Sequence, residues 1–154
     1  MAEPLALHVR RADAAGPAGP VVEVALRIPS DVAHVEAAVE LLARHCLGPA
    51  APARRTTFRF RVAVAEALAN AIVCGNGADP ARWVAVRAEC RPEDLRVHVT
   101  DEGDGFDPAA VPDPIGSDDL ERACGRGLFL IRNLSDSVEF SPRGNSLCMT
   151  FRLP

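Results

Sequence analysis

Residues 64–76, with the sequence VAEALANAIVCGN, carry a pattern that is typical of one face of a helix. Glu66, Asn70 and Cys74 are four residues apart, so their side chains stack along one side of such a helix. Glu66 could orient or deprotonate a hydroxyl nucleophile, and Asn70 offers a neutral oxygen to Mg²⁺, as a phosphoryl-transfer site requires. Taken alone, the pair also fits the polar edge of an ordinary amphipathic helix.

The helix that contains this pattern is predicted to run from about residue 57 to residue 74. Gly75-Asn76-Gly77 ends it, because glycine is common just past a helix C-terminus. Its apolar residues recur with a period of 3.6 and are expected to face the core. They are Phe58, Val62, Ala65, Ala69 and Ile72.

Residues 100–106, TDEGDGF, directly follow a predicted strand. Gly103 and Gly105 let the backbone turn sharply and approach a ligand closely. A buried carboxylate at the strand end, Asp101, could accept a hydrogen bond from an exocyclic amine such as that of adenine. A calcium loop is excluded, because an EF-hand counted from Asp101 requires Asp or Asn where this chain has glycine. A plain acidic turn is the alternative.

Residues 125–128, GRGL, are predicted to open another helix. Backbone N–H groups at a helix N-terminus, made accessible by Gly125 and Gly127, form a natural phosphate site, and Arg126 would add positive charge. The order of residues is not that of a P-loop. Taken alone, the motif fits a tight turn equally well.

Alternating or short apolar runs predict strands around these motifs, at 22–28, 83–86, 95–99, 137–140 and 147–153. A helix capped by Ser30-Asp31 is expected to reach about residue 46. Short turns between strands favour an α+β fold, a two-layer sandwich whose mixed, mostly antiparallel sheet is covered on one face by helices. Residues 1–20 are predicted to be a flexible arm before a domain of residues 21–154, although residues 5–9 could add an edge strand.

Composition narrows the class of protein. The net charge of −4 argues against a nucleic-acid-binding surface, and no apolar run reaches the ~20 residues of a membrane helix. The N-terminus lacks the pattern of a secretory signal. Five widely spaced cysteines without a C-x-x-C pair favour reduced thiols over a disulfide framework or structural zinc. We therefore expect a cytoplasmic protein that contacts neither membrane nor nucleic acid directly.

The motifs occur in the order E-x-x-x-N on a helix, D-x-G-x-G after a strand, a long loop, and G-x-G at a helix start. This order resembles the GHKL (Bergerat-fold, histidine-kinase-like) ATPase superfamily over about residues 22–153. The stretches VAEALANAIVCGN, VTDEGDGFDP and GRGLFLIRNLSDSVEF are most similar to the anti-sigma factor serine/threonine kinases. The resemblance implies ATP bound between helices and sheet under a mobile lid at about residues 106–124.

The resemblance implies ATP and Mg²⁺ as cofactors and gives each motif a role. Glu66 corresponds to the catalytic base of the family, Asn70 to its Mg²⁺ ligand, and Asp101 to the residue that accepts the adenine amine. The other expected nucleotide-binding residues come from the two glycine motifs: Gly103, Gly105, Gly125, Arg126, Gly127 and Leu128.

The implied activity is phosphorylation of Ser or Thr on an anti-anti-sigma (STAS-domain) partner, with sequestration of a sigma factor as a second function. Homodimers joined through residues 22–46 are expected. An ATP-binding regulatory module without kinase activity that controls a partner other than a sigma factor is the alternative. Cys74 stands where the family often has His, and Asn145-Ser146 follows Gly144 where the family usually has Gly-Thr. Either Asn145 or Ser146 could then contact the nucleotide.

Overall fold

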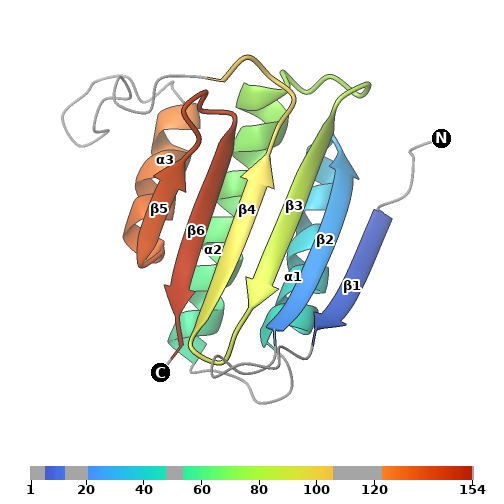
Figure 1. The fold of residues 1–154 in the computed structure, drawn as a ribbon. Helices are drawn as coiled ribbons and strands as arrows, with labels where there is room; N and C mark the ends of the chain where they lie inside the picture. The colour runs from blue at the N-terminus through green and yellow to red at the C-terminus, as the bar shows by residue number, and fades with distance from the viewer. Residues whose placement is uncertain (1–5, 13–20, 48–53, 106–122, 154) are drawn as a thin grey trace.

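The computed structural model describes residues 6–12, 21–47, 54–105 and 123–153. Within these ranges, one antiparallel sheet has the strand order β1-β2-β3-β4-β6-β5 (Figure 1). Its strands are β1 (Ala6–Ala12), β2 (Val21–Pro29), β3 (Trp83–Cys90), β4 (Asp94–Thr100), β5 (Ser137–Phe140) and β6 (Ser146–Arg152). The predicted mixed sheet therefore has no parallel strand pair in the described part of the chain.

The described helices lie together on one face of this sheet (Figure 1). The first is a 3₁₀ turn, η1, at Val32–His34, which leads into α1 at Val35–Leu47. The second, α2, spans Arg54–Asn70 and continues as a π-helical turn, η2, at Ala71–Gly75. The third, α3, spans Ala123–Leu134. This two-layer α+β arrangement confirms the predicted fold class.

The sequence signals at two helix N-termini can be compared with the structure. The carboxylate of Asp31 accepts a hydrogen bond from the Ala33 N–H (2.9 Å), which confirms the predicted cap before α1. Helix α3 begins at Ala123, two residues before the predicted start. None of the described helices is long and apolar enough to cross a membrane.

The face of α2 that packs on the sheet is mostly not the predicted one, although Ile72 of the predicted stripe is fully buried in η2. Phe58 heads the predicted stripe and is 62% exposed, whereas Phe60 is fully buried. The buried residues of α2 are Phe60, Ala63, Val64, Ala67 and Leu68. This second set also has helical spacing, so the helix is apolar over a wide arc. Periodicity alone cannot choose between two such stripes, and packing against the sheet decides between them.

The N-terminal segment contributes an edge strand. Residues 6–12 pair with β2 in antiparallel register from Ala6 with Arg27 to Ala12 with Val21. This part of the predicted arm therefore belongs to the sheet, in agreement with the alternative that the sequence left open. Of the predicted lid at 106–124, residues 106–122 lie outside the described residues.

The burial of Phe60, and not Phe58, predicts which of the two substitutions lowers stability. Phe60→Ala should lower the free energy of unfolding by about 3–5 kcal/mol, because it removes a buried ring and leaves a cavity. That ring lies edge-on to Phe151, with centroids 5.5 Å apart. Phe58→Ala is the matched control and should change stability by less than about 0.5 kcal/mol. Urea denaturation followed by circular dichroism measures both, and equal losses would contradict the assignment.

Candidate functional site

The end of the second helix meets the end of β4 at Gly75 and Asp101. A Cβ on Gly75 would overlap the Asp101 carboxylate, and a Cβ on Gly103 would overlap the Gly75 carbonyl oxygen. Both positions therefore exclude any side chain. The glycines of two motifs far apart in sequence thus bring the carboxylate of Asp101 against the helix end.

The surroundings of Asp101 hold its carboxylate without neutralising it. Its Oδ1 accepts a hydrogen bond from the Gly103 N–H (2.8 Å), and no ion pair joins it to another described residue. Partial burial raises the pKa of Asp101, and the Gly103 hydrogen bond and the charge of Arg82 only partly offset this effect. A carboxylate in such a place is suited to accept a hydrogen bond from a neutral donor.

Asn145 and Ser146 face opposite sides of the sheet. The Asn145 carbonyl accepts from the Asp101 N–H (2.9 Å), and the Asn145 side-chain amide donates to the Asp101 carbonyl (3.3 Å). The Ser146 hydroxyl lies 2.8 Å from that of Thr100 on the face without helices. Of the two residues left open by the sequence, Asn145 is therefore the one beside Asp101.

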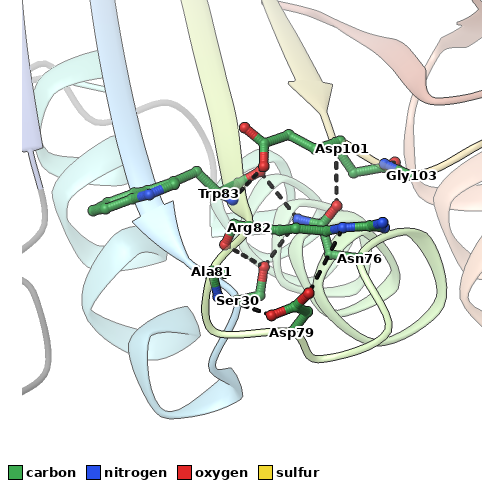
Figure 2. A network of polar contacts seen from close by, with 9 residues as sticks. Ser30, Asn76, Asp79, Ala81, Arg82, Trp83, Asp101 and Gly103 are labelled. Carbon is green, nitrogen blue, oxygen red and sulfur yellow. Dashed lines mark hydrogen bonds and ion pairs between the residues drawn. The ribbon is translucent and has the colours of Figure 1, made fainter.

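A buried amide that the sequence did not single out holds this end of the sheet together. The side-chain N–H groups of Asn76 donate to the Ser30 hydroxyl (2.9 Å) and the Trp83 carbonyl (3.0 Å). Its side-chain oxygen accepts from the Glu102 N–H (2.8 Å). Figure 2 shows this network, in which Asn76 lies between Ser30 and the turn that carries Asp101. The sequence showed Asn76 only as part of a helix terminator.

Glu66 and Asn70 are half-buried and lie one turn apart on α2. A Cβ on Gly127 would lie 2.6 Å from Nδ2 of Asn70, so the backbone of α3 packs directly against the Asn70 amide. The Glu66 carboxylate makes no hydrogen bond or ion pair with any described residue. The structure thus joins the E-x-x-x-N motif to the G-x-G motif and leaves the carboxylate available.

The second helix also connects the two parts of the site. Glu66 and Gly75 are nine residues apart, which corresponds to about 13 Å along a helix. Within this interval the Asn70 amide packs against Gly127 of α3, and Gly75 at the C-terminal end lies against Asp101.

The GRGL motif occupies the first turns of α3. Gly125 and Arg126 fall within the first four residues of the helix, whose backbone N–H groups have no partner inside the helix. The side chains of residues 123–126 are outside the described part. Leu128 is buried in the core, so only its backbone is available to a ligand.

One cysteine differs from the expectation. Cys74 is disulfide-bonded, which makes the prediction of reduced thiols wrong for this residue, while Cys46, Cys90 and Cys148 are free. An odd number of separated cysteines still allows one pair, and sequence spacing does not report which residues approach.

Comparisons with known proteins bear directly on this geometry. The sequence profile of the family described as "Histidine kinase-like ATPase domain" matches residues 28–151, which is most of the chain. The chain belongs to this ATPase family. An anti-sigma F factor from Oceanobacillus iheyensis is 31% identical over 100 residues, covering 61% of this chain and 68% of the relative. These matches confirm the resemblance inferred from the motifs.

Membership of the ATPase family implies that the chain binds ATP, and the described residues fit that ligand. Asp101 is a half-buried acceptor at one end of the site, and the first turn of α3 supplies N–H groups at the other. No three or more His, Cys, Asp or Glu residues gather into a metal site in the described ranges. Asn70 could supply one oxygen to Mg²⁺, which usually takes few protein ligands and several phosphate or water oxygens.

The Asn76 network gives a second test. Asn76→Ala should lower the free energy of unfolding by about 2–3 kcal/mol, because the Glu102 N–H and the Ser30 hydroxyl lose a partner. Asn133→Ala is the matched control, since the Asn133 side chain is exposed and donates only to the Phe129 carbonyl (2.8 Å). Thermal and urea unfolding of both variants provide the measurement. A loss in Asn133→Ala as large as that in Asn76→Ala would refute the role of the network.

Proposed function

We propose that this chain is an ATP-dependent serine/threonine kinase that phosphorylates an anti-anti-sigma (STAS-domain) partner and also sequesters a sigma factor. The observation that carries the proposal is the position of Glu66. Its carboxylate has no partner among the described residues and lies one helical turn before Asn70, which touches Gly127 of α3. A structural carboxylate would be expected to have a partner, whereas a general base must be available to its substrate.

The roles of the residues follow from their places in the site. Glu66 accepts the proton of the partner's Ser or Thr hydroxyl as that oxygen attacks. Asn70 presents its side-chain oxygen to Mg²⁺ beside the first turn of α3. Bound ATP supplies the phosphoryl group, and ADP is the leaving group. The base and the metal ligand thus lie on one rigid helix, which fixes their separation.

The two glycine motifs complete the nucleotide site in this proposal. Asp101 accepts the adenine amine, with Asn145 holding its backbone. Gly103 and Gly105 keep the turn after β4 close to the adenine ring. The phosphates are assigned to the first turns of α3: Gly125, Arg126, Gly127 and Leu128, the last through its backbone alone.

The proposed partners rest on the similarity to the anti-sigma F factor. We place the homodimer contact at residues 22–46, which include most of β2, η1 and most of α1. The regulator would act in the cytoplasm, where sigma factors work.

Transfer of phosphate tests the kinase. The chain, labelled ATP, Mg²⁺ and STAS-domain proteins encoded near its gene should give labelled Ser or Thr. Glu66→Gln should reduce the rate about 100-fold or more while leaving ATP affinity unchanged, because only the proton acceptor is lost. Glu93→Gln, which changes an exposed carboxylate between β3 and β4, is the control and should keep full activity. Tight ATP binding without transfer to any STAS protein would favour the non-catalytic regulatory module.

The nucleotide site can be tested separately by calorimetry with ATP. Asp101→Asn should weaken binding about tenfold or more with or without Mg²⁺, because a neutral amide oxygen replaces the charged acceptor of the adenine amine. Asn70→Ala should weaken binding only when Mg²⁺ is present. A loss in Asp101→Asn that is confined to Mg²⁺-containing buffer would contradict the adenine role.

A stability measurement separates a direct loss of ATP binding in Asp101→Asn from misfolding of that variant. Burial raises the pKa of folded Asp101 above its ordinary value of 3.8, so the ionised carboxylate destabilises the fold as the pH rises through that value. Asp101→Asn should therefore not lower the free energy of unfolding at pH 7. A marked loss of stability would show that the variant weakens ATP binding through the fold.

A further inference from the structure

The face of the sheet opposite the helices carries small and basic side chains in a regular pattern. In the pairing register Arg27 on β2 lies between Ala6 on β1 and Ala85 on β3. One row further along, Arg87 on β3 lies between Ala25 on β2 and His98 on β4. Arg27 thus lies between two alanines and Arg87 beside one, and these small side chains leave space between the long ones.

This pattern produces a hollow of about 440 Å³ over β1 to β4 and the start of β6. Its ionisable lining residues are Arg27, Arg87, His8 and His98, and no carboxylate lines it. Such a concentration of basic groups is notable in a chain whose net charge is −4. The hydroxyls of Thr100 and Ser146, 2.8 Å apart, close one end of the hollow.

Arg27 is not neutralised by a neighbouring acid. Arg27 stacks over the Trp83 ring at 4.6 Å, and no carboxylate in the described part of the chain is paired with it. The stacking holds its guanidinium in place while the N–H groups remain available.

Arg87 has one carboxylate neighbour, Glu89, which also lies close to two other basic residues. Glu89 lies 3.3 Å from Arg87, 3.1 Å from Arg91 and 3.9 Å from His98. Burial and the charge of Arg87 lower the pKa of His98, so its ring is neutral at pH 7. The hollow therefore keeps an excess of positive charge that comes from the arginines.

The neighbouring residues restrict the shape of a complementary anion. Glu23 and Glu89 lie opposite each other in the next row of the sheet, and Glu139 borders the far side on β5. These carboxylates would repel a continuous polyanion such as nucleic acid or an anionic membrane surface. A ligand with a few carboxylates in a defined spacing avoids them.

The spacing of the arginines indicates what that ligand is. Arg27 and Arg87 are diagonal neighbours on adjacent strands, and side chains so placed are about 7–8 Å apart at their base. Alternate residues of an extended peptide are separated by about 6.6–6.8 Å. We infer that the hollow binds an extended acidic segment of a protein partner, with carboxylates on alternate residues held by Arg27 and Arg87.

This surface is separate from the nucleotide site. The hollow is on the open face of the sheet, whereas Glu66 and Asn70 belong to α2 on the covered face (Figure 1). Changes in the hollow should therefore leave ATP affinity as it is. The proposed homodimer contact at residues 22–46 includes most of β2, and the sedimentation experiment below tests whether a second copy of the chain covers this face.

The test uses the full chain and a fluorescein-labelled peptide in which Glu and Val alternate over eight residues, read by fluorescence anisotropy. Arg27→Gln/Arg87→Gln should weaken binding about tenfold or more. Arg54→Gln/Arg55→Gln makes the same change in charge at exposed positions of α2 and should stay within about twofold of the parent. A peptide of the same composition with its four Glu residues contiguous should bind more weakly than the alternating one.

A third variant tests occupancy of the hollow itself. Ala85→Glu places a carboxylate beside Arg27 and should compete with the peptide. Equal losses in the two double-arginine variants would overturn the site in favour of general charge attraction, and so would equal binding of the two peptides. The proposal is also overturned if Ala85→Glu converts a dimer to a monomer in sedimentation without affecting peptide binding, since the face would then contact a second copy of the chain.

Discussion

The architecture of the candidate site depends on a single buried side chain, the amide of Asn76. It is 2% exposed and makes hydrogen bonds to residues of three segments, namely Ser30 after β2, Trp83 at the start of β3 and Glu102 after β4. An amide in an apolar interior is tolerated only when its donors and acceptor are paired, so these segments are held to one relative position. Asp101 immediately precedes Glu102 and is therefore fixed by the same network.

Side chains alternate between the two faces of the sheet, so the same strands carry two chemically different surfaces. Inward residues of β2, β3 and β4 such as Leu26, Val86 and Val97 form the apolar layer under the helices. Their outward neighbours are free of that packing and carry arginine, histidine and alanine instead. Because the period is two, a slip of one residue would exchange these surfaces, and the buried layer therefore also fixes the positions of the outward arginines.

Much of this could be predicted from the sequence, because the relevant signals are local. The residues 137–140 are the strand β5 as predicted, and Asp31 caps the helix turn that it precedes. The order of the three motifs also predicted the family. What the sequence did not provide depends on contacts between distant segments. Phe58 and Phe60 belong to two apolar stripes on one helix, and only the position of the sheet decides which is buried.

The candidate site shows the same difference between local sequence signals and contacts of distant segments. Glu66 and Asn70 stood out because their residue types and spacing suit a phosphoryl-transfer site, and Asp101 stood out as a carboxylate at a strand end before two glycines. Asn76 did not, since its importance comes from Ser30 and Glu102, which lie 46 and 26 residues away in the chain. The disulfide at Cys74 also depends on proximity in space, which cysteine spacing does not reveal. Sequence thus identified chemical groups better than it identified the groups that position them.

The close approach of Gly75 and Gly103 has a consequence for how this sequence can diverge. A side chain at position 103 would meet the carbonyl oxygen of residue 75, which is a backbone atom present in every amino acid. No substitution at position 75 can relieve that overlap, so a second mutation cannot rescue the first. Over evolutionary time, glycine at position 103 should persist even where the neighbouring chemistry changes, and a homologue that lacks it would need a different path of the chain after β4.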